Sequence, residues 1–590
     1  MPSSAPALAT TASGLLLVLS IIVPVGGVLL AFVLGDRHVR QIAFAVIPLG
    51  LAIAGAVVVT SAQTSPLVYL LGAWPPPLGV ALRADGLSAV MLAITAVVIC
   101  AVAVSAAPVF RPAAADAQRT SFAFWILLLA IWAALNIIFV GGDLFTLYVA
   151  LELLTFAAVP MASLEGRAET VQAALRYLLF ALLGSVLYLL GTALLYGLYG
   201  TLDIMLLSHR VRAEPGVYVA AALMTTGLLA KTALFPLHLW LPPAHAGAPA
   251  AASAILSGLV VKGSFFILLR LWFNVLPGLS GFAAAQLLAA LGAGAIVVGS
   301  VVALRQERLK LLVAYSTLAQ IGYLFLMFPL AANASGRLES GSALAAGVLQ
   351  AISHAAAKAA MFLAVGSIYA GLGHDRITGL SGVARVLPIS VLAFAIGGFA
   401  LMGVQPGGAA LAKELWLQEA ASTGQWWWVV VLQVGAMFTT AYVVLVLAHA
   451  LAPSDQRISL VRTSPPGRDL AALALATCSL LLGLVPWEAC LPIPPDVTAK
   501  SFGIDALAEL LLSVLGGAAL AILFSPWAHP PNSSDAWKQL TRPIEPLRRT
   551  CVELGSLVER GDGVLRQWST AGICLLLLVL TLAALTYAAN

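Results

Sequence analysis

Apolar segments long enough to cross a lipid bilayer recur along the whole chain. About 20 apolar residues in a helix span the roughly 30 Å of hydrocarbon in a membrane, and we count 14 to 16 such segments. Of the 590 residues 61% are hydrophobic and only 9% are charged, and the mean hydropathy is +1.01. This composition excludes a water-soluble fold. It predicts an all-α polytopic membrane protein.

The expected spans divide into consecutive blocks. N-terminal spans occupy 1–120, spans 4–8 occupy 121–273, spans 9–13 occupy 284–451, two more occupy 469–526, and the last covers 570–588. The first apolar run lacks a basic start and a small-residue cleavage site, so we expect a transmembrane helix rather than a signal peptide. Connections after odd-numbered spans carry thirteen Arg and Lys, against six after even-numbered spans. The positive-inside rule therefore predicts that the odd-to-even connections are cytoplasmic.

No pattern in the chain predicts a cofactor, a metal or a nucleic-acid surface. Five scattered cysteines form no Cys-x-x-Cys pair, which argues against an iron–sulfur cluster, a haem or a zinc site. A glycine-rich phosphate loop is absent from the sequence. Since the basic residues are spread over many loops, the net charge of +5 indicates topology rather than nucleic-acid binding.

One stretch near the C-terminus, 537–568, has a different pattern. Apolar residues from Trp537 to Trp568 recur at steps of three and four, with charged residues between them. This predicts one amphipathic helix of about 32 residues, about 48 Å long, broken near Pro543 and Pro546. Six basic residues predict the cytoplasmic side. Such a helix lies on the membrane surface or against a neighbouring subunit, and we favour the neighbour.

Several charged residues interrupt the apolar spans. A charge near the centre of a bilayer costs at least about 2.5–3.5 kcal/mol, so each one requires a partner or a role. The residues are Glu152, Lys231, Lys262, Lys413, and the pair His354 and Lys358, whose i, i+4 spacing puts both on one helix face. One static salt bridge would explain one lysine and one glutamate, but here the cations outnumber the acids. A desolvated lysine gives up its proton more readily, so the set predicts a proton relay. In this relay we expect Glu152 to pair with Lys231 and to keep it protonated while the two are close.

Prolines break two of these spans beside a lysine. LLAKTALFPLHLWLPPAHAGAP contains Lys231 followed by Pro236, with His238 and His245 close by, and GVQPGG (403–408) precedes Lys413. Irregular backbone is tolerated in a membrane only where protein or a wet cavity encloses it. Two broken helices at corresponding places indicate a transporter built from two repeats. The two histidines extend the predicted relay, and without carboxylates or cysteines at ligand spacing they do not predict a metal site.

Long motifs around these residues resemble one family. They are DLFTLYVALELL, the segment AKTALFPLHLWLPPAHAGAPAAASAILSGLVVKGSFFILLR, LKLLVAYSTLAQIGYL and SHAAAKAAMFLAVGSI, within about 143–413. The chain is thereby similar to the antiporter-like membrane subunits of respiratory complex I, of Mrp-type sodium/proton antiporters and of membrane-bound hydrogenases. Among these, the D-type component of Mrp antiporters and the M-type component of complex I are the most similar.

The resemblance implies two inverted five-helix repeats, 121–273 and 284–451, with broken seventh and twelfth helices. It implies that Glu152 is the fifth-span glutamate, Lys231 and Lys262 the lysines of spans seven and eight, His354 the eleventh-span histidine and Lys413 the twelfth-span lysine. The tail helix would be a short counterpart of the lateral helix of some members. The chain departs from the family at GGAALAKE, which lacks the usual Gly-Phe before the lysine, and at Arg308, which replaces a frequent aspartate.

We expect this chain to be a proton-translocating subunit of a multisubunit complex in the bacterial inner membrane. The subunit itself is expected to catalyse no reaction. The complex would be a redox-driven pump of the NADH-quinone oxidoreductase or hydrogenase type, or a Mrp-type cation/proton antiporter. Its partners would be other membrane subunits, the bilayer and protons, with sodium left open. An alternative is the membrane subunit that energises an inorganic-carbon uptake system. A pure scaffold would not need buried lysines.

Overall fold

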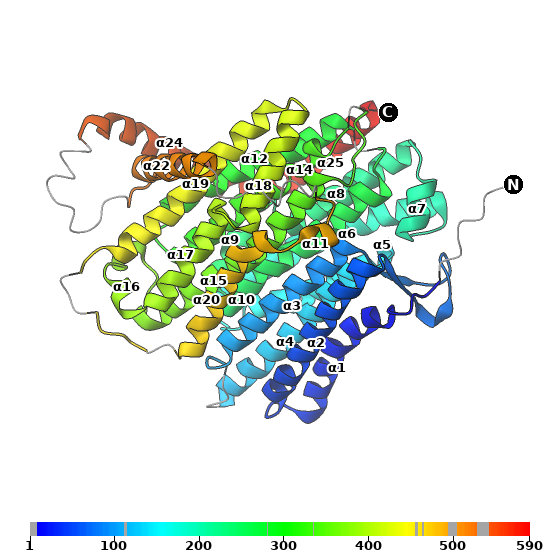
Figure 1. Ribbon diagram of the computed structural model, residues 1–590, viewed down its shortest axis with the longest axis horizontal. Helices are drawn as coiled ribbons and strands as arrows, with labels where there is room; N and C mark the ends of the chain where they lie inside the picture. The colour runs from blue at the N-terminus through cyan, green and yellow to red at the C-terminus, as the bar shows by residue number, and fades with distance from the viewer. Residues whose placement is uncertain are drawn as a thin grey trace.

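The structure is a bundle of long helices (Figure 1). It is a computed structural model that describes residues 9–110, 115–279, 281–333, 335–454, 458–462, 465–493, 504–527 and 542–589. In this part of the chain, thirteen helices are individually long and apolar enough to cross a membrane. The all-helical polytopic architecture expected from the sequence is confirmed.

The first six long helices follow the predicted spans closely. They are α1 (Leu15–Leu34), α2 (Val39–Gln63), α3 (Gly86–Ala106), α4 (Ala115–Val140), α5 (Leu144–Ala162) and α6 (Ala168–Tyr199). Aspartates fix two of the helix starts: Asp85 accepts a hydrogen bond from the Ser88 backbone, and Asp143 accepts from Phe145 and Thr146. Between α2 and α3 the sequence pattern missed a short antiparallel hairpin of β1 (Leu67–Leu70) and β2 (Ala81–Ala84).

The next span is broken, as Pro236 predicts. After the short helix α7 (Ile204–Arg210), α8 (Pro215–Thr232) ends at Ala233, whose φ of 59° is left-handed, and the chain resumes a helix only at α9 (Leu241–Gly247). Proline lacks the N–H that a continuous helix would need. The indole of Trp240 donates at 3.0 Å to the Ala230 carbonyl, to which the Ala233 N–H also donates, and this bond joins the start of α9 to the end of α8. The predicted span 217–240 therefore extends to Gly247.

The centre of the bundle is formed by helices that other helices surround on all sides. One continuous segment comprises α10 (Ala250–Ile255), the π-helical η2 (Leu256–Val260), α11 (Val261–Leu269) and the π-helical η3 (Arg270–Val275), and its most apolar part is completely buried. Around it lie α12 (Phe282–Arg305), α13 (Leu309–Leu324), α14 (Met327–Leu330) and α15 (Ser342–Leu372). At one end of this group, Arg308 Nε lies 3.0 Å from Asp375 Oδ1. Arg308, which stands where the family often has an aspartate, is thus paired with the acidic residue Asp375.

A second break lies at GVQPGG. After α16 (Val383–Val386), α17 (Pro388–Met402) ends at Gly403, whose φ is 80°, and α18 (Gly408–Ser422) follows directly after the break. The Gly483 N–H donates to the Pro406 carbonyl at 2.8 Å. Gly483 belongs to η5 (Leu482–Leu484), which follows α20 (Pro466–Leu481); α19 (Trp426–Leu451) lies between α18 and α20 in the chain. Residues 403–406 are half-buried, and this contact with η5 covers one side of the irregular backbone.

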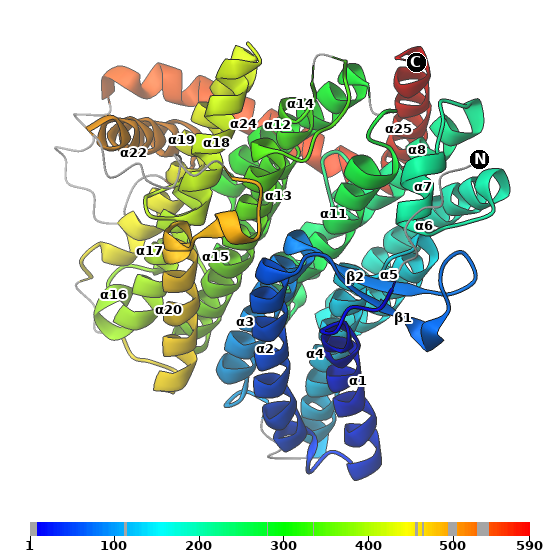
Figure 2. The same cartoon turned by 45° about the vertical axis from the view of Figure 1, so that its right-hand side comes forward.

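The C-terminal elements run from one side of the bundle to the other. α22 (Ile504–Phe524) packs against α19, α25 (Trp568–Ala588) packs against α8, and α24 (Glu545–Leu565) connects the two across α12 (Figures 1 and 2). The predicted amphipathic helix exists but is shorter, beginning at Glu545 after the turn η7 (Arg542–Ile544), and residues 537–541 of that prediction lie outside the described part. One of its faces packs on its own chain, a contact that the sequence analysis did not consider.

Helices α6 and α8 approach each other closely at a pair of glycines. A Cβ on Gly227 would lie 2.3 Å from the Gly184 carbonyl oxygen, and a Cβ on Gly184 would lie 2.7 Å from the Gly227 oxygen. Small residues of this kind let membrane helices pack backbone to backbone. Lys231 lies one turn after Gly227 on the same face, so this contact fixes the position of the lysine.

We expect Gly227→Ala to lower the melting temperature of the protein in detergent, because the added methyl group must push the α6 and α8 backbones apart. The melting temperature is measured by intrinsic fluorescence. Gly197→Ala is the matched control, since a Cβ there meets no atom within 4 Å. Equal melting temperatures for the two variants would contradict the close packing of α6 and α8.

Candidate functional site

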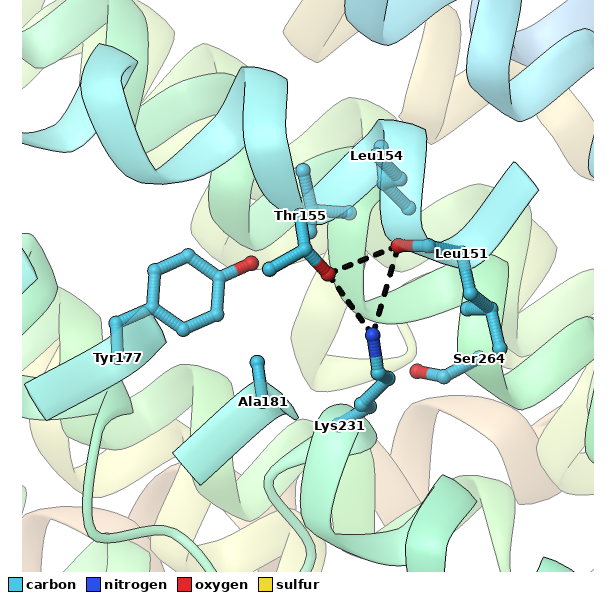
Figure 3. A pocket seen from close by; sticks show the side chains of 8 residues that line it. Leu151, Leu154, Thr155, Tyr177, Ala181, Lys231 and Ser264 are labelled. Atoms are coloured by element: carbon cyan, nitrogen blue, oxygen red, sulfur yellow. Dashed lines mark hydrogen bonds between the residues drawn. The ribbon is translucent and has the colours of Figure 1, made fainter. Parts of the chain in front are cut away.

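The predicted pair of Glu152 and Lys231 is formed in the structure. Lys231 Nζ lies 3.2 Å from Glu152 Oε1. It also donates to Thr155 Oγ1 at 2.8 Å and to the Leu151 carbonyl at 3.5 Å, and Figure 3 shows these two contacts. Glu152, Leu151 and Thr155 belong to one turn of α5, whereas Lys231 ends α8. The side chains of Lys231 and Glu152 are 6% and 15% exposed. An opposite charge and two neutral acceptors therefore hold the ammonium group away from bulk water.

A cavity lies directly beside Lys231. Its wall is formed by Leu151, Leu154, Thr155, Tyr177, Ala181, Lys231, Val260 and Ser264 (Figure 3). Ser264 Oγ accepts a hydrogen bond from Thr232 Oγ1 at 2.9 Å, so the residue next to Lys231 is tied to α11. Because Ser264 lies two residues after Lys262 in α11, the cavity extends from the first lysine to the helix that carries the second.

Lys262 and His354 are in direct contact at the centre of the bundle. Lys262 Nζ lies 2.5 Å from His354 Nδ1 and donates to the Ser257 carbonyl at 2.6 Å, and both side chains are fully enclosed. Ser257 belongs to the π-helical turn η2, where the wider backbone spacing displaces carbonyl groups from the usual ladder. The two nitrogens lie at hydrogen-bond distance, so one of them can donate a hydrogen to the other.

Lys358 extends the buried polar group into the second half of the bundle. It lies one turn after His354 in α15, donates to Ser316 Oγ and stands over the ring of Tyr442 at 5.7 Å. Beyond Tyr442, Gln320 Nε2 donates to Tyr442 Oη at 3.2 Å and to Thr439 Oγ1 at 3.1 Å. Gln350 Nε2 donates to Gln320 Oε1 at 2.9 Å.

Sequence reasoning did not find these hydroxyl and amide groups. Gln320, Gln350, Thr439 and Tyr442 are uncharged, and each is common enough in a membrane helix to pass unnoticed. A search for amides in otherwise apolar spans would have found the two glutamines, because a buried amide also requires hydrogen-bond partners.

Lys413 lies in a different setting from the central lysines. It is half-buried near the start of α18, and its Nζ donates to Gln433 Oε1 of α19 at 3.0 Å. Lys262 and Lys358 are fully buried. The greater exposure agrees with a place near an end of a polar path, and its role in transport stays a prediction.

The two histidines near the first break are both fully buried but have different surroundings. His238 Nε2 lies 2.6 Å from Asp562 Oδ1 of the C-terminal helix α24. The His245 ring stacks on Phe362 at 4.9 Å, and within the described structure neither of its ring nitrogens has a hydrogen-bond partner. Among the described residues, no group of three His, Cys, Asp or Glu gathers in the manner of a metal site.

The fold and the site together define a class of protein: a polytopic membrane protein with ionisable side chains buried between two broken helices. A family described as NADH:quinone oxidoreductase/Mrp antiporter, transmembrane, matches residues 141–439. The chain belongs to this family.

Relatives and a solved structure agree with this assignment. NADH-quinone oxidoreductase subunit N of Desulforudis audaxviator is 31% identical over 72% of this chain and 84% of its own length. A Na⁺/H⁺ antiporter component of Alkalihalophilus pseudofirmus, of the D type, is 28% identical over 66% of this chain and 78% of its own. The fold matches a chain of the Mrp complex from Dietzia with a TM-score of 0.72 and 24% identity, covering 88% of this chain and 98% of that one.

We expect Gln320→Leu to reduce proton conduction about tenfold while leaving assembly intact, because leucine has a similar volume but cannot bridge Gln350 to Thr439 and Tyr442. Conduction is measured as the decay of a pH difference across proteoliposomes that contain the purified complex. Gln286→Leu is the matched control, since Gln286 donates to Gln425 at 2.7 Å, away from the buried lysines. Equal rates in the two variants would remove Gln320 from the path.

Proposed function

We propose that this chain is the proton-translocating membrane subunit of a multisubunit complex. One observation carries the proposal: Glu152 with Lys231, Lys262 with His354, and Lys358 follow one another from α5 to α15 inside helices that are otherwise apolar. Buried ionisable residues are costly in a membrane and mark ion pathways. The family membership supports the same reading.

Proton transfer would begin at the Glu152–Lys231 pair. While the carboxylate is 3.2 Å away, it stabilises the ammonium form of Lys231. When the two move apart, Lys231 loses that stabilisation and releases its proton towards Lys262 through the adjoining cavity. Lys231 lies in the last turn of α8, so its long side chain can change rotamer while the α8 backbone stays fixed by the contact between Gly184 and Gly227.

The next step would use the short contact between Lys262 and His354. A proton that arrives at Lys262 Nζ can pass to His354 Nδ1 along their hydrogen bond, and His354 is one turn from Lys358. Lys413 would accept the proton nearer the outlet. His245, with two unpartnered ring nitrogens among the described residues, would serve as a side station of the relay.

The two broken helices would mark two repeats with opposite orientation, 121–273 and 284–451. Each break combines a left-handed residue, a proline and a nearby lysine. This shared design supports the repeat assignment. The distribution of arginine and lysine in the loops supports a cytoplasmic location for α24, and the bacterial relatives support the inner membrane.

The driving force would come from other subunits. The relatives are named as subunits of an NADH-quinone oxidoreductase and of a Na⁺/H⁺ antiporter, which supports an assembly with further membrane subunits, powered by a redox reaction or by a sodium gradient. The identity of the subunits that copurify with the chain distinguishes these two assemblies.

We expect Lys231→Ala to abolish proton conduction by the purified complex in proteoliposomes under a potassium diffusion potential. Lys231→Arg should lose nearly as much, because a guanidinium group keeps its charge and cannot release the proton. The readout is the fluorescence of a trapped pH dye.

Lys310→Arg controls for the size of arginine, since Lys310 lies near the start of α13 and donates to the Ala248 carbonyl outside the proposed path. Conduction at the wild-type rate in Lys231→Arg would contradict the proposed role of Lys231.

A further inference from the structure

The C-terminal helix α24 packs on its own chain with its polar face. The inward side holds Arg548, Val552, Gly555, Glu559, Asp562 and Arg566, whereas the leucines 547, 554 and 557 and Val564 point outward and are at least 50% exposed. An amphipathic helix of a soluble domain does the reverse and buries its apolar side. Ionic contacts therefore contribute to the attachment of α24 to the bundle, beside the apolar packing of Val558.

One of these contacts anchors the helix to the end of α12. Arg305 Nε lies 2.7 Å from Glu559 Oε2, and Arg305 Nη1 donates to the Val552 carbonyl at 3.1 Å. The close approach uses Gly555, where a Cβ would meet the Arg305 side chain at 3.2 Å. The Glu559 side chain is 41% exposed, so this pair lies at the edge of the contact.

The second contact reaches far deeper, to the broken helix. The Asp562 side chain is 0% exposed and lies 2.6 Å from His238 Nε2, while its other oxygen accepts from Tyr315 Oη and from Arg566 Nε, both at 2.8 Å. Burial alone would raise the pKa of Asp562, but the hydrogen bond and charge of His238, the Arg566 charge and the Tyr315 hydroxyl outweigh it, and the pKa lies below its ordinary value.

A carboxylate in this position fixes the proton on His238. Because Asp562 accepts at Nε2, the neutral ring carries its hydrogen on Nε2, and Nδ1 keeps the lone pair. Nδ1 is buried and has no hydrogen-bond partner among the described residues. It can therefore take up a proton, and the imidazolium that forms is stabilised by the carboxylate 2.6 Å away.

We infer that Asp562 is a positioning residue of the proton path: through it, α24 holds His238 in the tautomer that accepts a proton at Nδ1 and sets how strongly that proton is held. The inference rests on the proposed function and adds a residue from the tail of the chain, 324 positions after the histidine it acts on. The proton enters at Nδ1 and leaves from the same atom, while the Nε2–H bond to Asp562 stays intact.

The charged and titratable neighbours of this pair are few. Tyr315 comes from α13, Arg566 and Glu559 come from α24, and Arg305 comes from α12. Arg566 and Arg305 pair with Asp562 and Glu559, so a proton on His238 adds one net charge to the group. Removal of the Asp562 charge must therefore weaken proton binding at His238. The Tyr315 hydroxyl donates to the same carboxylate, so its removal must strengthen proton binding at His238.

The test measures the pH dependence of conduction by the whole complex in proteoliposomes. In Asp562→Asn, the acid-side fall of conduction should move to lower pH by about one unit relative to the wild type, as expected when the opposite charge beside the imidazole is lost. In Tyr315→Phe it should move to higher pH. Opposite shifts from two variants of one cluster cannot result from a general loss of stability.

Glu559→Gln is the matched control, because it removes a carboxylate from the same face of α24 without touching His238. Its pH profile should equal that of the wild type, whatever its melting temperature. His238→Gln completes the test, because it removes the proton acceptor and should itself lower conduction; conduction at the wild-type rate in His238→Gln would overturn the inference.

If Asp562→Asn and Glu559→Gln give the same pH profile of conduction, the inference is overturned. If the Asp562→Asn variant fails to assemble, Tyr315→Phe becomes the test. An unshifted pH profile in Tyr315→Phe then overturns the inference. Lys231→Ala distinguishes a failure of this inference from a failure of the proposed function. If Lys231→Ala abolishes conduction while neither Asp562→Asn nor Tyr315→Phe shifts the profile, the proposed function stands and the role of Asp562 falls. If Lys231→Ala conducts normally, the proposed function itself is lost.

Discussion

The cost of holding charge in an apolar interior governs this structure. An ion at the centre of a bilayer is destabilised by several kcal/mol unless protein groups replace its water. Four buried basic groups have specific protein partners in place of water: Glu152 and Thr155 for Lys231, the Ser257 carbonyl and His354 for Lys262, Ser316 for Lys358, and Asp562 for His238. The irregular features of the fold supply these replacements. The π-helical turn at Ser257 presents a carbonyl to Lys262, and the break after Thr232 places Lys231 at the end of a helix.

The sequence predicted the helices and the ionisable residues because both depend on local patterns. An apolar run of about 20 residues is a helix wherever it occurs in a membrane, and a lysine within such a run is conspicuous. The contact between Glu152 and Lys231 was also foreseen, from the family resemblance and from charge complementarity. Both breaks were located, since a proline removes a backbone donor irrespective of its surroundings.

The partners of these residues could not be predicted in the same way. Periodicity in 537–568 predicts an amphipathic helix, but it does not say which side packs on protein, and here the polar side does. Asp562 looked like any charged residue of an exposed face, and only the folded chain shows that it is completely buried beside His238. The hairpin of β1 and β2 was missed because four-residue strands between two long apolar runs leave almost no pattern.

The charges of Lys262, His354 and Lys358, the central group, limit how the proposed path can conduct protons. These three basic side chains lie close together, and in the described part of the chain none of them pairs with a carboxylate. Full protonation would place like charges side by side without water, which is far more costly than one charge alone. On the proposed path, an incoming proton would therefore displace a proton already present rather than add to it. The carboxylates lie outside this group: Glu152 meets Lys231, and Asp562 meets His238 at the first break. On the proposed path, a proton would thus be held by opposite charge on either side of the group and repelled within it. That arrangement favours transfer one proton at a time, with each step controlled by the distance between an acid and a base on different helices.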